Sequence, residues 1–399
     1  LRSELVAAGI RGVRGDRGGA SFEGPLEAGM RACLHSRVAM RVLLELARFP
    51  AEDADALYDG ARGIDWSEWL TARTTLAVEA SVSSSAITHS GYAALKVKDA
   101  VVDALREKLG ARPDVDPKDP DVGIVLHLAR GEATLSLDLA GAPLHRRGYR
   151  AITTLAPLKE TLAASILVLG RVAEDRAFVD PMCGSGTLAI EHALRARRIA
   201  PGLGRAFGFQ RWPMYRGGPQ SAWDRMKSEA HAAALPRTPA PILARDLHPK
   251  AVDAARRNAL AAGVAADVLV EQGDARDLQP IADAGTIATN PPYGERLMGR
   301  EGEARGGRDD RRADRRGERG ARRAPETDPT DRRAGATQAR KLAGFYRGLA
   351  ETFARHAGWD LVVLSGNPAL KAALPWKPEI DHRLWNGPIE THLLRYQIP

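Results

Sequence analysis

Residues 177–187 read Ala-Phe-Val-Asp-Pro-Met-Cys-Gly-Ser-Gly-Thr, and this stretch decides the fold. Residues 177–180 predict a short buried strand, and residues 188–197 predict the helix that follows it. Between them, Gly184 and Gly186 allow a ligand to approach the backbone N–H groups at the start of the helix. The arrangement predicts a turn that holds a nucleotide-like ligand.

The chain around this turn alternates helices and strands, which is the pattern of a doubly wound parallel sheet. A helix is expected at 158–169, and further strands are expected at 241–244, 268–271, 286–289 and 360–365. Asn386-Gly387 lies between two strand-like runs and predicts a tight hairpin. Residues 144–399 are therefore interpreted as one α/β domain with a Rossmann-like sheet.

Residues 1–143 have a different rhythm and are interpreted as a separate α+β region. Apolar residues recur at helical spacing from Met30 to Leu46 and predict one amphipathic helix. A strand is expected at 77–82, a second helix at 92–108, and two strands joined at Gly131 within 123–139.

Composition limits the class of protein. The 58 basic and 50 acidic residues give a net charge of +8, which favours a polyanionic partner. Forty-eight of the basic residues are arginines, however, and a GC-rich coding bias would produce the same excess. The chain shows no apolar run of membrane-spanning length and no signal segment, so a cytoplasmic protein without a membrane partner is expected. Cys33 and Cys183 form no C-x-x-C pair, so neither a disulfide nor a metal site is expected.

The ligand of the glycine turn has two candidate identities. Residues 184–189 fit the dinucleotide pattern G-x-G-x-x-A, but the acidic residue expected about 20 positions later is missing. Instead, Asp246 ends the next expected strand, and Asp274 with Ala275 follows the one after it. Two carboxylates at successive strand ends suit an adenosine and favour S-adenosylmethionine, with Asp246 on the ribose and Asp274 near the adenine amine. Each aspartate alone could equally cap a helix.

The strongest motif is Asn290-Pro291-Pro292-Tyr293, which follows the strand expected at 286–289. Prolines fix the backbone so that the Asn290 amide and the Pro291 carbonyl can face one ligand. Two acceptor oxygens can hold both hydrogens of an exocyclic amine while Tyr293 stacks on the ring. The motif predicts a site that binds an amine to which a methyl group is transferred. An ordinary turn at the end of a strand is the alternative.

At these residues the chain resembles a known family. Residues 180–187 and 290–297 (NPPYGERL) resemble motifs I and IV of amino-directed class I S-adenosylmethionine-dependent methyltransferases. Residues 144–150 (LHRRGYR) with 156–164 resemble the segment that enters their catalytic domain, and residues 91–100 resemble a THUMP RNA-binding domain with its ferredoxin-like companion. Together they are similar to the bacterial 23S rRNA guanine-N2 methyltransferases, in the half that modifies helix 74.

The resemblance implies an α+β ferredoxin-like and THUMP region at 1–143, followed by a class I methyltransferase domain at 144–399. It implies catalysis at residues 290–293. The cofactor-binding residues that it implies are Asp180, Pro181, Cys183, Gly184, Gly186, Thr187, Asp246, Asp274, Ala275 and Thr161.

RNA contacts are expected from two groups of basic residues. The first is Lys96 with Lys98, for which a solvated helix face is the alternative, and the second is Arg146, Arg147 and Arg150. The implied partner is 23S rRNA in a large-subunit precursor.

Residues 299–337 depart from the family pattern. They contain twelve arginines, nine acidic residues and no large apolar side chain, and are expected to be a disordered insertion. An additional RNA tether is the alternative. The chain also starts inside what the resemblance makes a first helix, and no second methyltransferase domain follows Pro399, so a single modification is expected.

The leading hypothesis is N2-methylation of a guanine in 23S rRNA. A tRNA guanine-N2 methyltransferase with a THUMP domain and an N6-adenine DNA methyltransferase are rivals, because Asn-Pro-Pro-Tyr also serves adenine amines. An RNA chaperone without catalysis is the alternative from a different class. The oligomeric state stays open.

Overall fold

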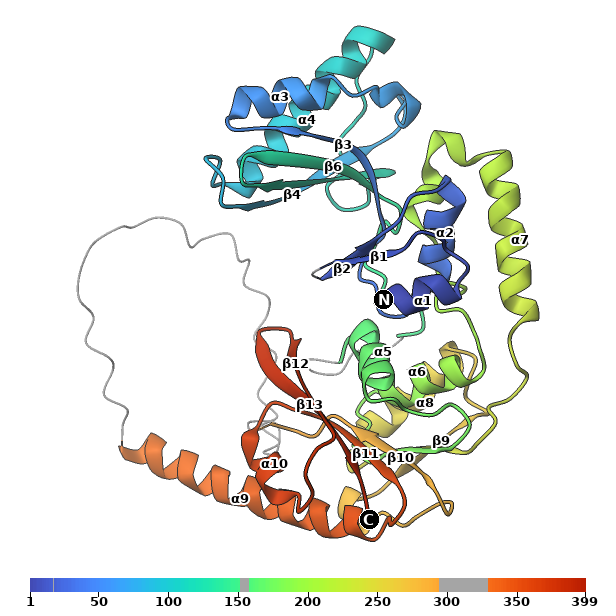
Figure 1. The fold of residues 1–399 in the computed structure, drawn as a ribbon, viewed down its shortest axis with the longest axis vertical. Helices are drawn as coiled ribbons and strands as arrows, with labels where there is room; N and C mark the ends of the chain where they lie inside the picture. The colour runs from blue at the N-terminus through green and yellow to red at the C-terminus, as the bar shows by residue number, and fades with distance from the viewer. Residues whose placement is uncertain (17, 151–157, 294–328) are drawn as a thin grey trace.

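The computed structural model describes residues 1–16, 18–150, 158–293 and 329–399. These residues form a front domain and a C-terminal domain, each built on its own sheet, with the N-terminal helices lying between the two sheets (Figure 1). The expected insertion lies outside the described residues as far as 328, and so do 294–297 at the end of the NPPYGERL stretch. Among the described residues, no helix has the length and apolar character that a membrane crossing requires.

The front domain contains a four-stranded sheet in the order β3-β6-β5-β4. Only the β4–β5 pair is parallel, and α3 and α4 cover one face (Figure 1). The elements of this domain are α1 (Arg2–Ala7), β1 (Arg14–Asp16), β2 (Gly19–Ser21), α2 (Leu26–His35), β3 (Leu43–Pro50), α3 (Ala54–Arg62), a 3-10 turn (Trp66–Glu68), β4 (Leu76–Ser83), α4 (Ser90–Leu109), β5 (Val122–Ala129) and β6 (Glu132–Asp138). The expected strands and the second helix are confirmed, with a turn at Gly131.

The helix expected from Met30 to Leu46 is wrong beyond His35. Helix α2 ends at His35, and β3 begins at Leu43 and pairs with β6. The reason lies in the spacing, because residues four apart share one face of a strand as well as one face of a helix. The apolar pattern therefore continued from the helix into the strand without a visible break.

The C-terminal domain is a doubly wound sheet, as predicted, with the order β12-β13-β11-β10-β7-β8-β9. Strands β7 to β11 are parallel, and β12 and β13 add an antiparallel hairpin at one edge. Helices α5, α6 and α8 bury one face of the sheet, and α9 and α10 bury the other. The elements are α5 (Glu160–Leu169), β7 (Ala177–Asp180), α6 (Thr187–Ala196), β8 (Ile242–Asp246), α8 (Pro249–Ala261), β9 (Val268–Gln272), a 3-10 turn (Ala275–Asp277), β10 (Gly285–Thr289), α9 (Pro329–Ala354), β11 (Asp360–Ser365), α10 (Pro368–Ala373), β12 (Ile380–Asn386) and β13 (Ile389–Gln397).

Helix α9 starts earlier than the sequence predicts. It begins at Pro329, so the last part of the expected insertion, 329–337, is helical and the disorder expected there is wrong. Proline suits the first helical position, and the alanines and arginines that follow are good helix formers. Charge and the lack of large apolar residues concealed this first part of the helix.

The excursion between α6 and β8 packs on the front domain. It contains two 3-10 turns (Gly208–Arg211 and Pro213–Tyr215) and α7 (Gly218–Ala232). Buried side chains of this excursion, including Phe209 and Trp223, belong to the same core as Met30 and Leu34 of α2. A domain boundary at 143/144 therefore divides the sequence, but residues from both sides of it pack in one hydrophobic core.

Candidate active site

The glycine turn joins β7 to α6 at the carboxyl edge of the sheet. Gly184 and Gly186 have φ angles of 54° and 82°, in the left-handed region that favours glycine. A Cβ on Gly186 would lie 3.1 Å from the Cβ of Ala255, so the missing side chain also lets α6 approach α8 closely. Glycine at these positions therefore provides the backbone conformation of the turn and the close packing of α6 on α8.

Asp246 lies where the sequence predicts it, at the end of β8 beside the glycine turn. One oxygen of its carboxylate accepts the Gly184 N–H at 2.8 Å, and the other accepts the His248 N–H at 2.9 Å. The residue therefore shapes the turn and the start of α8. Because a carboxylate has about four acceptor positions, both oxygens can still accept a hydroxyl from a ligand.

Asp180 is fully buried at the end of β7. Its carboxylate accepts the Met182 N–H at 3.3 Å, and burial raises the pKa of Asp180 to about 7. Asp246 adds to this shift in the same direction. The site thus contains a carboxyl group whose charge changes near neutral pH.

Asp274 behaves mainly as a cap. Its carboxylate accepts the Arg276 N–H at 2.8 Å and pairs with the Arg276 guanidinium at 2.6 Å, which lowers the pKa of Asp274. Ala275 is buried beside it. The adenine contact expected of Asp274 stays a prediction, and Arg276 would compete for the same oxygens.

The remaining expected cofactor residues surround the turn. Pro181 and Cys183 are buried in it, and the Cys183 N–H donates to the Arg245 carbonyl at 2.9 Å. Thr187 starts α6 and accepts from Arg150 at 3.1 Å. Thr161 is buried in α5, where its hydroxyl donates to the Met40 sulfur at 3.0 Å, so it faces the front domain.

The Asn-Pro-Pro-Tyr turn begins at the same edge of the sheet. Asp180 ends β7, and β10 pairs with β7 in parallel. Asn290, which directly follows β10, therefore lies at the same edge of the sheet as Asp180. The Tyr293 hydroxyl donates to the Asn290 side-chain oxygen and accepts from the Asn386 amide at 3.3 Å. The glycine turn and the Asn-Pro-Pro-Tyr turn therefore lie at the same edge of the sheet.

Sequence reasoning missed the residues that hold this turn. The Tyr346 hydroxyl of α9 donates to the Pro292 carbonyl at 2.8 Å, and the Asn367 amide donates to the Tyr293 carbonyl at 3.1 Å. A Cβ on Gly366 would lie 2.9 Å from the Tyr293 ring, so one side of the ring packs on a bare backbone. Asn367 follows β11 at the carboxyl edge of the sheet, and this position was the one feature of the sequence that could have indicated its role. Nothing in the sequence around Tyr346 indicated a contact with the turn.

Comparisons with known proteins agree with this geometry. Family models match residues 1–43 as the RlmL ferredoxin-like domain, residues 51–138 as a THUMP domain, and residues 147–304 as an RMKL-like methyltransferase domain. The ribosomal RNA large subunit methyltransferase K/L of Syntrophotalea carbinolica is 42% identical over 411 residues, which cover all of this chain and 52% of that protein. Over its full length, this chain is similar to the ribosomal RNA large subunit methyltransferases K/L.

A second relative of the same name, from Pseudomonas aeruginosa, is 38% identical over 410 residues and is covered to 51%. The chain thus spans about half the length of the curated relatives it matches. Among solved structures, SMU.472, a methyltransferase complexed with SAH, has a TM-score of 0.81 at 27% identity, covering 99% of this chain and 93% of that one. A Listeria monocytogenes protein described as a predicted N6-adenine-specific DNA methylase also has a TM-score of 0.81, at 26% identity, covering 100% of this chain and 93% of that one.

Two of the three arginines before the methyltransferase sheet are paired with carboxylates of the protein. Arg147 is buried, where it pairs with Glu191 at 3.6 Å and donates to the Leu144 carbonyl at 2.8 Å. Arg150 pairs with Glu160 at 2.8 Å. The phosphate contacts expected of both stay predictions, and the carboxylates that already hold these guanidinium groups would compete with RNA phosphates. Arg146 is exposed, and its RNA contact stays a prediction.

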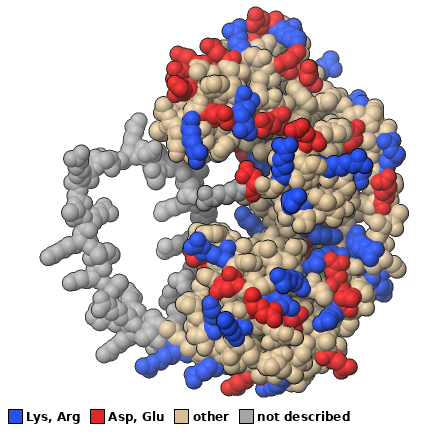
Figure 2. Space-filling model, viewed as in Figure 1, with Lys and Arg blue, Asp and Glu red and all other residues tan. Residues whose placement is uncertain are grey.

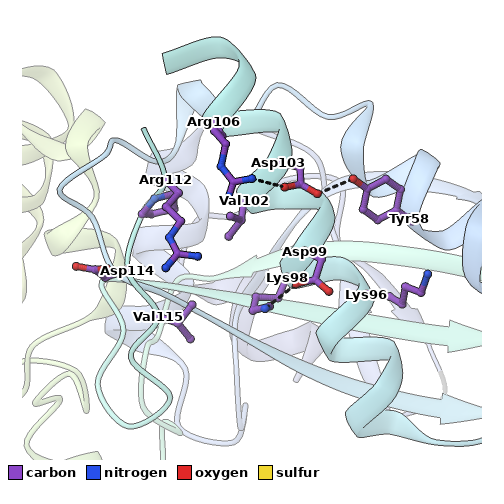
Figure 3. Close-up of a pocket in the computed structure, with 11 residues that line it drawn as sticks. Tyr58, Lys96, Lys98, Asp99, Val102, Asp103, Arg106, Arg112, Asp114 and Val115 are labelled. Carbon is purple, nitrogen blue, oxygen red and sulfur yellow. Dashed lines mark hydrogen bonds and ion pairs between the residues drawn. The ribbon is translucent and has the colours of Figure 1, made fainter. Parts of the chain in front are cut away.

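Lys96 and Lys98 line an open pocket of about 430 Å³ on α4 of the THUMP domain (Figure 3). Lys98 pairs with Asp99 at 2.6 Å, and Lys96 lies 3.5 Å from Asp55. Figure 2 shows basic and acidic side chains interspersed over this domain. Phosphate binding here stays a prediction, and the neighbouring carboxylates would weaken it.

Both cysteines are buried free thiols. Within the described ranges, no group of three or more His, Cys, Asp or Glu residues is placed to hold a metal ion.

Proposed function

We propose that this chain methylates the N2 amine of a guanine in 23S rRNA, in the helix 74 region of a large-subunit precursor, with S-adenosylmethionine as the methyl donor. One observation carries the proposal: Asp180 ends β7 and Asn290 directly follows the parallel neighbour β10, so the proposed amine acceptor site adjoins the glycine turn. The THUMP domain and the K/L relatives support a structured RNA as the substrate and the cytoplasm as the place of action.

The residues of the glycine turn fit S-adenosylmethionine. Gly184 and Gly186 leave the helix start uncovered, and Asp246 has acceptor positions left for ribose hydroxyls. Asp180 is a buried carboxyl that can pair with the ammonium of the methionine part. When bound, the cofactor supplies an electrophilic methyl group, which bonds to the amine nitrogen as its bond to sulfur breaks.

The acceptor turn supplies orientation rather than strong base catalysis. The Asn290 side-chain oxygen and the Pro291 carbonyl would accept the two hydrogens of the guanine amine, which aims its nitrogen lone pair at the methyl group. Tyr293 would stack on the base with the face that Gly366 leaves free. The proton that the nitrogen loses can leave to water after transfer, because the amine that carries the new methyl group and both hydrogens is a cation and a strong acid.

The test is transfer of labelled methyl groups to 23S rRNA, tRNA and DNA, followed by mass mapping of the product. Label in rRNA as N2-methylguanine supports the proposal, and label in adenine of DNA contradicts it. Asn290→Ala should keep cofactor and RNA affinity but lose turnover, because the amide is proposed to act on the substrate only through the amine of the inserted base. Turnover within a few-fold of wild type would remove Asn290 from the reaction.

A further inference from the structure

The hairpin of β12 and β13 projects beyond the sheet on the side of the active site. The two strands pair as far as Asn386 with Ile389, whereas β11 pairs with β13 only up to Ser365 with His392. The tip of the hairpin, residues 384–391, therefore extends past the carboxyl end of β11. In Figure 1 this tip points from the methyltransferase sheet toward the front domain.

The tip is attached to the acceptor turn by one face. Asn386 donates its side-chain amide to the Tyr293 hydroxyl at 3.3 Å, and Leu384, on the same face of the strand, packs half-buried on the core. Alternation along the strand places Trp385 on the opposite face. Trp385 directly precedes Asn386, which contacts Tyr293. The Cα atoms of Trp385 and Asn386 are therefore about 3.8 Å apart.

Trp385 is the exposed tryptophan of this chain. All seven tryptophans lie in described parts, and Trp385 is 56% exposed while the other six are buried or half-buried. The Arg383 guanidinium lies 5.4 Å from the centre of its ring. A single exposed apolar side chain is ordinary on a protein surface. The position of this one, next to the acceptor turn, is what requires an explanation.

The charges of the tip largely cancel. Arg383, at the base of the tip, lies 3.9 Å from Glu390, the charged residue within it. A ligand that binds here through phosphates would therefore gain little from electrostatic attraction. A flat aromatic surface fits a nucleobase, which has a π-face whatever its identity.

We propose that the hairpin tip contacts the RNA strand that carries the target base, with Trp385 stacking on a nucleobase beside it. The inference rests on the proposed function and deepens it. A target base must leave its stack to reach Asn290, and its departure exposes the face of a neighbouring base. Trp385 covers such a face, so the extruded arrangement is stabilised on both sides, by Tyr293 at the target and by Trp385 at its neighbour.

The experiment uses the full chain and transcribed 23S rRNA, with RNA affinity measured by fluorescence anisotropy and KM and kcat measured by methyl transfer. Trp385→Ala should weaken RNA affinity and raise KM about tenfold, the range expected for one stacked base, with an unchanged slope of affinity against salt. Trp385→Phe should retain most of the affinity. Affinity for S-adenosylhomocysteine, measured by calorimetry, should be the same in every variant.

Leu269→Ala is the matched control, because Leu269 is 64% exposed on β9 at the opposite edge of the sheet. It should behave as wild type. The inference would be overturned if the RNA affinity of Trp385→Ala were within twofold of wild type, whatever the activity. It would also be overturned if the slope of RNA affinity against salt changed in Trp385→Ala while Trp385→Phe behaved as wild type. Failure of the wild-type chain to methylate any rRNA would contradict the proposed function instead, and the two failures are distinguishable because RNA affinity is measured without turnover.

Discussion

The chain of hydrogen bonds from Asn386 through Tyr293 to Asn290 leads to a prediction about turnover. Tyr293→Phe keeps the ring against Gly366 and removes the hydroxyl that donates to Asn290 and accepts from Asn386. Asn386→Ala removes the outer end of the chain and leaves the ring and its hydroxyl in place. If the hydroxyl orients the Asn290 amide toward the amine, both variants should lower kcat with little change in RNA KM.

The magnitude follows from the type of contact. A neutral hydrogen bond contributes about 0.5–1.5 kcal/mol, which corresponds to about two- to twelvefold in rate. Because the two contacts act in series through one hydroxyl, their effects should not add. Asn386→Ala in the Tyr293→Phe background should have almost no further effect, so the interaction energy of the double-mutant cycle should nearly equal the effect of Asn386→Ala alone.

The assay is methyl transfer to 23S rRNA by the four proteins of the cycle, at saturating cofactor, with kcat and RNA KM determined separately. Asn386→Ser, which keeps a donor on a shorter side chain, should recover part of kcat. His382→Ala, an exposed residue on the same strand, serves as the control for hairpin integrity. Additive losses in the double variant, or a loss of the same size in His382→Ala, would refute the serial arrangement.

Three further predictions follow from the buried groups and from Gly366. Affinity for S-adenosylhomocysteine, measured by calorimetry, should rise as the pH is raised from about 6 to about 8, because the Asp180 carboxylate that pairs with the ligand's ammonium forms as pH passes its pKa of about 7. Asp180→Asn should flatten this profile, and an equally flat wild-type profile would contradict the role. Glu191→Ala should lower the free energy of unfolding in urea by about 3–5 kcal/mol, since it leaves Arg147 buried without its carboxylate. The control Glu132→Ala breaks an exposed pair with Arg48 and should cost less than about 1 kcal/mol; equal losses would show that the buried pair is not special. Gly366→Ala should lower kcat and leave cofactor affinity unchanged, because its Cβ would displace the Tyr293 ring, whereas Gly344→Ala, with open space around it, should be neutral in a methyl-transfer assay.

The sequence predicted those parts of the site that are continuous in the chain. The glycine turn and Asn290 each follow a short buried strand, and strand-turn-helix signals are local enough to place both at one sheet edge. Parallel pairing then brings Asp180, Asp246 and Asn290 together without any further information. The antiparallel hairpin at the edge of the sheet agrees with the prediction from Asn386-Gly387, because Gly387, at φ 63°, provides the turn.

The contacts that hold the acceptor turn were not predictable in the same way. Tyr346, Asn367 and Asn386 reach it from three elements separated from it by 50 residues or more of chain, and each is an ordinary residue in its own segment. The ion pairs of Arg147 and Arg150 were not predictable either. The two arginines lie in a basic cluster of the sequence, and nothing in that cluster shows that Glu191 and Glu160 pair with them in the fold. Charge in a sequence shows that a partner exists, not whether the partner is RNA or the protein itself.

The same buried pair explains why the two halves of this chain depend on each other. Arg37, which follows α2 of the front domain, donates to the Ile199 carbonyl just past α6 at 2.7 Å, and Arg147 donates to the backbone at Ser36 and pairs with Glu191. Burial raises the pKa of Glu191, and Arg147 and Arg37 oppose that shift, so the carboxylate relies on cations from outside the methyltransferase sheet. A cut at residue 150 would remove both cations and uncover the apolar side of α7 that packs on α2. The front domain therefore contributes to the folded methyltransferase domain as well as to any RNA contact, and loss of methylation on its removal would not by itself show that it positions the substrate.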